Sequence, residues 1–417
     1  MSILSESALF GLPYWFYATL PIVALIGVAA SAKVLNFRII SVIYLVLIIT
    51  PAVSPVSAYV TGAQFFTLQN PGLQSDLYLN SKAILFVILF AGLSTLGMLR
   101  PVSFGRSVVL PNTRVKNSTR IMVFLFFFIM FVLFLESGNV ITSAYADFKT
   151  GASPRFSSVV NQAFNVSAAI LIADWTTKQK HRINLFFIIL FISFCLLVAR
   201  RTLALGLLLV LVSIISSGRI SMRTYFYVGI GFLLLAAVGT VRGVGLIELL
   251  SEGDFRERSL NVYYLPGGAS NIYMSLLATI DLREAGGLPG FFEFGPWDWF
   301  AGQYEGAFLK RAYYDYNGGF FIVSLVYFHL GVFGILLFGY LLGVLVRKAD
   351  NKLSRLLEEG HGGWPASVAI GFLLVLPNMV WYHPIGTLKL FAAITFGYIL
   401  MALFSSGASS VRTRRSR

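Results

Sequence analysis

The chain has 417 residues, of which 57% are hydrophobic and only 12% are charged, and its mean hydropathy is +0.78. These values exclude a soluble globular domain. Apolar runs such as 121–135 lack the alternation of a barrel strand, and only helices or closed barrels satisfy every backbone group in hydrocarbon. The sequence therefore predicts an all-α, polytopic integral membrane protein. Its one cysteine, Cys195, excludes a disulfide framework and a cysteine-based metal site.

The apolar runs predict about 11 transmembrane helices. In chain order they are expected at 14–32, 39–58, 83–99, 120–136, 157–174, 183–199, 203–217, 225–240, 318–346, 365–382 and 387–406. No cleavable signal peptide is expected, because the first ten residues have no basic start.

The net charge of +14 is distributed unevenly among the predicted connections. Alternate connections hold 20 of the 32 Lys and Arg residues, while the other 12 are spread over much longer connections. The positive-inside rule therefore predicts a cytoplasmic C-terminus and an N-terminus on the outer side. The surplus charge reflects topology and contact with anionic lipid, so no nucleic-acid partner is expected.

Three parts follow from this topology. Residues 1–241 are expected to hold about eight membrane spans, 242–317 a large outer loop, and 318–417 about three spans and a basic tail. A loop of this length is too long for a mere connector and favours a functional role. Within it, Asn271 to Glu284 is apolar at helical spacing and is predicted to lie as a short helix on the membrane surface.

Arginines on the predicted outer side are candidates for binding a lipid diphosphate, because guanidinium offers a planar fork of donors to phosphate oxygens. Arg200 and Arg201 lie between two apolar runs with almost no loop. Arg242 ends the next outward helix, and Arg256 and Arg258 follow in the loop. The alternative is that these are ordinary headgroup contacts or salt-bridge partners of nearby acids.

A general base must reach the proton of an attacking hydroxyl, and several outer residues could serve. Of the outer acids, Asp315 and Glu305 are the best placed, because they precede the next predicted helix; the others include Asp281 and Glu284, each expected to be solvated. His383 lies at an outer helix end, whereas His329 lies about 16 Å into a span and is expected to pack against another helix. The absence of Walker A, HExxH, CxxC and GxSxG patterns argues against an ATPase, a zinc enzyme and a serine hydrolase.

The stretch YNGGFFIVSLVYFHLGVFGILLFGYLLG, residues 316–343, resembles the helix after the large periplasmic loop in bacterial O-antigen polymerases of the Wzy type. In that family an Asn or Ser begins the helix, followed by an aromatic residue and two glycines. The corresponding residues here are Asn317, Tyr327, Gly331 and Gly334, whose glycines would let a neighbouring helix or an isoprenoid chain approach closely. The run ARRTLALG also looks like the basic outer hairpin of that family.

The resemblance implies a GT-C-like glycosyltransferase in the bacterial inner membrane, with its N-terminus in the periplasm. It would transfer a growing glycan from undecaprenyl diphosphate to a lipid-linked repeat unit at the periplasmic face, with no metal or other cofactor. Arg242, Asp315 and His383 would be catalytic. Substrate binding would fall to Arg200, Arg201, Arg256, Arg258, Arg311, Tyr314 and Asn317. Donor, acceptor and membrane lipid are the expected partners, with a chain-length regulator protein as a candidate.

Three alternatives remain open on the sequence. An O-antigen ligase acts on similar substrates but expects a histidine in its large loop, and 242–317 contains none. A transporter or flippase of lipid-linked oligosaccharide would need polar groups along a membrane-depth pathway, whereas the predicted spans are almost uncharged. A non-enzymatic scaffold would not require the outward arginines.

Overall fold

The computed structural model describes residues 13–32, 34–35, 37–53, 76–100, 165–173, 201–215, 226, 264–286, 320–359, 364–381, 388–396 and 399. Every regular element among them is helical, which confirms the all-α prediction for this part of the chain. The helices are α2 (Tyr14–Ser31), α3 (Ile39–Ile49) with the 3₁₀ turn η1 (Thr50–Ala52), α6 (Leu77–Leu99), α11 (Arg201–Ile215), α15 (Tyr264–Glu284), α18 (Ile322–Glu359) and α19 (Trp364–Trp381).

Most predicted spans within the described residues coincide with a helix, although their ends differ by several residues. Residues 165–173 and 388–396 are also helical and fall inside two further predicted spans. The predicted spans at 120–136 and 183–199 lie outside the described residues, so the number of spans remains a prediction. The division at residues 242 and 317 likewise remains a prediction.

Three of the described helices are long and apolar enough to cross a membrane: Tyr14–Ser31, Leu77–Leu99 and Ile322–Ser354. Shorter apolar helices cover Ile39–Ala52, Leu205–Ile214 and Ala366–Trp381. On α2 the side chains of Val23 and Ile26 are 61% and 63% exposed, as expected for a helix that meets lipid on most of its surface. The described helices are therefore those of a membrane-embedded protein.

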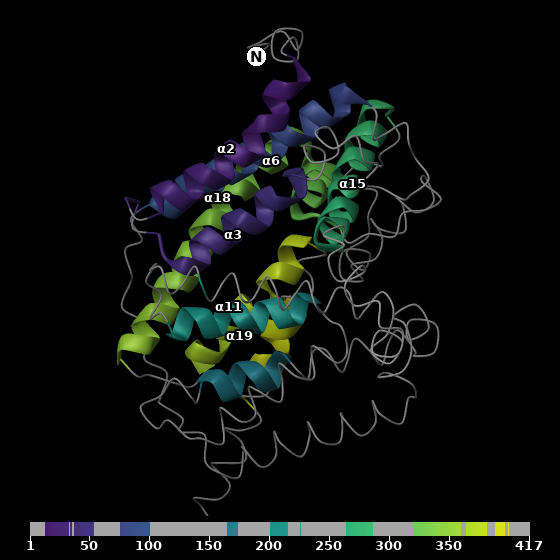
Figure 1. The fold of residues 1–417 in the computed structure, drawn as a ribbon. Helices are drawn as coiled ribbons and strands as arrows, with labels where there is room; N and C mark the ends of the chain where they lie inside the picture. Colours follow the sequence, from purple (N-terminus) through teal and green to yellow (C-terminus); the bar gives the residue numbers. More distant parts are fainter. Residues whose placement is uncertain are drawn as a thin grey trace, which may run out of the picture.

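In Figure 1, α2, α3, α6 and α18 run alongside one another, α15 lies at one end of this group, and α11 and α19 lie side by side below it. α6 and α18 form the most extensive helix pair. They pack in parallel, because Phe86 contacts Tyr327 and, further along both helices, Ser94 contacts Gly339. Both helices therefore begin on the same side of the bundle.

This parallel arrangement constrains the chain between the two helices. After α6 ends at Leu99, the chain must return to its starting side before α18 begins at Ile322. An odd number of crossings is needed for that return. The five spans predicted between residues 100 and 321 satisfy the requirement, whichever side of the membrane the two helices start on.

Small residues make the close approach of α6 and α18. The Ser94 hydroxyl donates a hydrogen bond to the Gly339 carbonyl at 3.0 Å, and a Cβ on Gly343 would lie only 2.0 Å from the Ser94 carbonyl oxygen. A Cβ on Gly97 would lie 2.2 Å from the Tyr340 carbonyl oxygen. Without a hydrophobic driving force between helices in lipid, such backbone proximity is what stabilises the pair. Close approach of a neighbouring helix is predicted from the sequence at Gly331 and Gly334, earlier in the same helix.

The side chain of Trp381 connects α19 to α3 by a hydrogen bond. Pro51 has no N–H group, so the Leu47 carbonyl loses the partner that a continuing helix would give it. The Trp381 indole donates to that carbonyl at 2.8 Å, which satisfies it from the neighbouring helix. At the other end of α3, the buried Asp350 of α18 accepts a hydrogen bond from the Ser41 hydroxyl at 2.9 Å.

α15 differs from the sequence expectation. It was expected as a short helix on the membrane surface, but it begins at Tyr264, and residues 272–280 are almost all buried against α6, α18 and η1. The cause is that its polar residues are mostly hydroxyls bonded within the bundle. The Ser275 hydroxyl is 2.8 Å from the Ser324 hydroxyl, and Thr279 donates to the Ser275 carbonyl at 2.6 Å. Residues that resembled a polar face are thus satisfied inside the protein.

Candidate functional site

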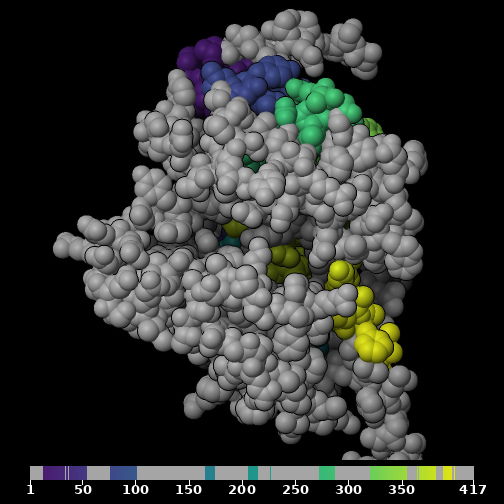
Figure 2. All heavy atoms as spheres, turned by 90° about the vertical axis from the view of Figure 1, so that its right-hand side faces the viewer, coloured from purple at the N-terminus to yellow at the C-terminus, as the bar shows by residue number. Residues whose placement is uncertain are grey.

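Charged side chains of the described residues meet where α6, α15 and the start of α18 come together. We call Lys82, Arg283, Glu284, Tyr327 and Gly331 the outer cluster, since they lie on the predicted outer side. Lys82 and Tyr327 are each the sixth residue of their helix, hence about 8 Å from its start at 1.5 Å per residue. In Figure 2, α6 and α15 reach the surface of the molecule side by side at the same end.

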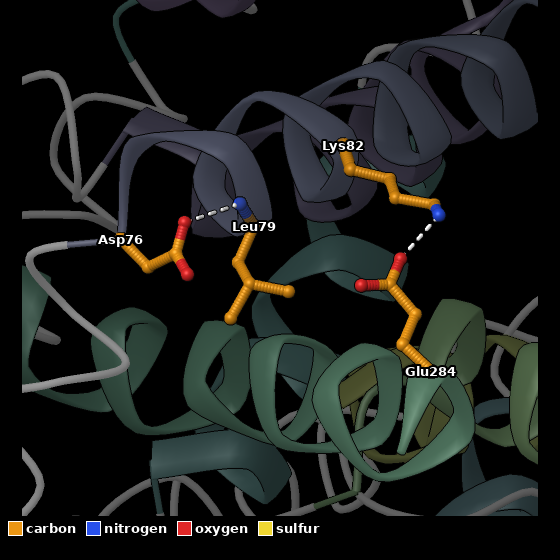
Figure 3. A network of polar contacts seen from close by, with 4 residues as sticks. All are labelled: Asp76, Leu79, Lys82 and Glu284. Atoms are coloured by element: carbon orange, nitrogen blue, oxygen red, sulfur yellow. Dashed lines mark hydrogen bonds and ion pairs between the residues drawn. The ribbon is translucent and has the colours of Figure 1, made fainter. Parts of the chain in front are cut away.

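The start of α6 is fixed by a side-chain cap. Asp76 has extended backbone angles, and its carboxylate accepts from the Tyr78 N–H at 2.9 Å and from the Leu79 N–H at 3.0 Å. Figure 3 shows the bond to Leu79. An aspartate in this position also favours the positive end of the helix dipole. The cap fixes the residue at which α6 begins. It thereby also fixes the position along the helix at which Lys82 faces α15.

Lys82 forms an ion pair with Glu284, the last residue of α15 (Figure 3). The lysine is almost buried, whereas the Glu284 side chain is 35% exposed. The Lys82 ammonium also lies 5.6 Å from the centre of the Tyr78 ring. A lysine in an apolar helix requires a partner of this kind, because a buried unpaired charge is strongly unfavourable. The ion pair therefore ties the end of α15 to α6.

Arg283 makes different contacts from its neighbour. Its Nη1 donates to the backbone carbonyls of Tyr327 and Phe328, both at 3.0 Å, and its guanidinium carbon lies 5.4 Å from the centre of the Tyr327 ring. The same ring also packs against Phe86 of α6, with the two ring centres 4.8 Å apart. Arg283 is thus held by carbonyl oxygens and an aromatic face.

The two carbonyls lie just before a break in α18. Gly331 has φ 62° and ψ −147°, a conformation that side chains other than that of glycine essentially exclude. From this residue on, the chain leaves the path of the first turns, so carbonyls in the preceding turn lose helical N–H partners. Arg283 donates to two carbonyls of this turn, those of Tyr327 and Phe328. The close approach predicted at Gly331 is therefore that of an arginine side chain rather than of a helix backbone.

The expectation that His329 packs against another helix remains a prediction, because the ring contact described for it is with Phe328 of the same helix. The His329 side chain is buried, and its ring lies edge-on to that of Phe328 with centres 5.0 Å apart. Gly334 does not receive a neighbouring helix, because a Cβ there would lie 2.3 Å from the Val326 carbonyl oxygen of α18 itself. The break folds the two parts of α18 closely together at this point.

The site residues predicted from the sequence lie almost entirely outside the described residues. Arg201 is the first residue of α11, but its side chain lies outside them. The others outside are Arg200, Arg242, Arg256, Arg258, Arg311, Tyr314, Asp315, Asn317 and His383. Their roles therefore remain predictions. Asn317 is the nearest to the outer cluster along the chain, three residues before the described residues resume at Phe320 and five before α18 begins at Ile322.

Sequence reasoning did not single out Lys82 or Arg283, and it expected Glu284 to be solvated. One signal was present: a lysine directly before a long apolar run needs a partner, and the pattern DLRE ends an otherwise apolar segment. Chemically the outer cluster has two cations and one acid, an arrangement suited to holding an anionic group. Among the described residues, no three or more His, Cys, Asp or Glu side chains come together to hold a metal ion.

No protein-family model matches the chain, and no match is found among curated proteins or among solved structures.

Proposed function

We propose that the chain is a polymerase of lipid-linked oligosaccharides, a glycosyltransferase of the bacterial inner membrane with a GT-C-like arrangement of about 11 spans. The observation that carries the proposal is the outer cluster. It gathers two cations at the starts of α6 and α18, on the side where the predicted loop 242–317 and the outward arginines lie. The diphosphate of a lipid carrier would reach the protein at that side. The resemblance of 316–343 to the Wzy-type helix supports the same reading.

The reaction forms a glycosidic bond at the periplasmic face. A hydroxyl oxygen of the incoming repeat unit attacks the anomeric carbon of the growing glycan, and the bond from that carbon to the diphosphate oxygen breaks. The acceptor proton goes to a general base, for which Asp315 and His383 are the candidates. Arg242, with Arg201, Arg256 and Arg258, neutralises the negative charge that develops on the departing undecaprenyl diphosphate.

The test is the glycan chain length in cells that lack the native gene. Wild type is expected to restore a ladder of chain lengths on a gel, and Arg242→Ala is expected to give a single repeat unit at equal membrane abundance. Lys348→Ala is the matched control, because Lys348 is an exposed cation on the predicted cytoplasmic side and should leave the ladder intact. A wild type without a ladder would refute the proposal.

One observation favours a second candidate, a transporter of lipid-linked oligosaccharide. α18 is interrupted at Gly331, and interrupted helices form the substrate sites of many transporters. The two candidates differ in where the lipid-linked unit is found when the protein is missing. A transporter leaves the unit in the inner leaflet, whereas a polymerase leaves single units on the outer side.

A further inference from the structure

The ion pair between Lys82 and Glu284 is unevenly buried. The Lys82 side chain is 11% exposed, whereas that of Glu284 is 35% exposed. A charge on an apolar helix needs an anionic partner, but that partner need not be a side chain of the protein. Of the two residues, Glu284 is the one that can move away into its surroundings, because its side chain already meets them. Lys82 is therefore a cation whose anion can be exchanged.

The exchange requires movement of the Glu284 side chain only. Other contacts hold α15 beside α18: Arg283 donates to two backbone carbonyls of α18 at 3.0 Å each, and the Ser275 hydroxyl lies 2.8 Å from that of Ser324. None of these contacts involves the Glu284 carboxylate. α15 therefore keeps its place beside α18 when the ion pair opens.

Glu284 is poorly placed on its own helix. It is the last residue of α15, where backbone carbonyls without helical partners carry partial negative charge and disfavour an acid. Its pairing with Lys82 offsets this repulsion. A diphosphate carries more negative charge than one carboxylate and offers several acceptor oxygens, so it competes well for a lysine ammonium. The ion pair is thus suited to opening when a phosphate group arrives.

The Lys82 ammonium lies at the level where the phosphate groups of membrane lipids are found. Tyr78, one turn nearer the start of α6, is 40% exposed, and exposed tyrosines of membrane helices lie at the headgroup level. The ammonium is 5.6 Å from the centre of the Tyr78 ring, so the lysine stem carries the charge outward along the helix. A lipid phosphate reaches this level while its hydrocarbon chain stays in the bilayer. The position therefore favours a lipid as the source of the anion.

We propose that Lys82 binds a phosphate group of the diphosphate carrier lipid, and that Glu284 occupies this cation until the carrier replaces it. The identity of the lipid rests on the proposed polymerase function, in which undecaprenyl diphosphate carries the glycan. No covalent bond changes in this step: one anion leaves the ammonium and another takes its place. Glu284 thereby sets the affinity for the carrier by competition.

Binding is measured with the full chain in phosphatidylcholine nanodiscs, titrated with farnesyl diphosphate in a calorimeter. Glu284→Gln is expected to lower Kd by about threefold to fivefold, the weight of a partly exposed ion pair. Lys82→Met is expected to raise Kd at least about tenfold, since a hydrogen bond to a charged group has roughly that weight. The two effects have opposite signs, which an ion pair with a purely structural role would not produce.

Two further variants serve as controls. Lys82→Met/Glu284→Gln leaves no unpaired charge between the helices and is expected to bind as weakly as Lys82→Met. Asp281→Asn removes an acid from the same helix while Glu284 still holds Lys82, and its Kd should equal that of wild type. The proposal is overturned if Glu284→Gln binds no more tightly than Asp281→Asn, or if the double variant binds as tightly as wild type.

Competition identifies the source of the phosphate. Inorganic pyrophosphate, and phosphatidylglycerol added to the nanodiscs, are each expected to displace farnesyl diphosphate only weakly. Displacement by an equal concentration of pyrophosphate would reveal a site for a free anion, and displacement by phosphatidylglycerol a general headgroup site; either result overturns the assignment to the carrier. Binding needs no transfer, so a wild type that restores no glycan ladder refutes the polymerase and leaves these measurements unaffected.

Discussion

Replacing Gly343 with alanine is expected to push α6 and α18 apart. The new Cβ would lie 2.0 Å from the Ser94 carbonyl oxygen and 2.8 Å from its Cα, both of which are backbone atoms that cannot rotate away. Restoring an ordinary carbon–oxygen contact of about 3.3 Å requires a helix shift of roughly 1 Å, and overpacking on this scale costs about 1–3 kcal/mol. The shift would also stretch the bond from Ser94 to Gly339, now 3.0 Å long.

Gly92→Ala is the control for this experiment, because it makes the same change on α6 where a Cβ meets nothing within 4 Å. Alanine favours a helix over glycine by about 1 kcal/mol, so the control is expected to be neutral or slightly stabilising. Thermal unfolding of the purified protein in detergent measures both variants. If Gly343→Ala unfolds at the same temperature as Gly92→Ala, the close packing of the two helices is refuted.

Two further predictions concern single contacts between helices. Lys82→Met and Glu284→Gln should each lower the free energy of unfolding by about 1 kcal/mol, a small value because Glu284 is partly exposed. The double variant should lose less than the sum of the two single losses, and a double-mutant cycle in the same detergent measures this difference. Strict additivity would show that the pair does not interact. Trp381→Phe should cost about 1–2 kcal/mol, because the Leu47 carbonyl loses its indole donor. Trp364→Phe is the comparison, since its bond of 3.3 Å to Thr395 is longer, and a greater loss there would contradict the assignment.

Much of the helical arrangement could be predicted from apolar runs alone. α2 and α19 appear within a few residues of their predicted spans, because nearly every residue in them is apolar and the length matches a membrane. α6 begins at Leu77 rather than at the predicted residue 83, because its first turns contain the polar Asn80, Ser81 and Lys82. α15 was harder to place. Its Ser275 and Thr279 count as polar in a sequence pattern, but both are satisfied by short hydrogen bonds inside the bundle. A pattern cannot distinguish a polar face from hydroxyls with partners in the protein.

The candidate site was less accessible to sequence reasoning for a related reason. Lys82 and Glu284 are 202 positions apart, and nothing local to either residue indicates the other. Gly331 lies within an apolar helix, where a glycine usually indicates close packing rather than a break. Its unusual backbone becomes understandable only once Arg283 is seen against it.

The pairing of α6 with α18 has a consequence for how the protein is made. Ser94 and Gly339 are 245 positions apart, so at 5–20 residues per second roughly 10 to 50 seconds of translation separate the two halves of this contact. During that interval the small residues of α6 that later meet α18 lack their partner helix. The closest helix contact of the bundle is therefore completed only after the C-terminal third of the chain has been made.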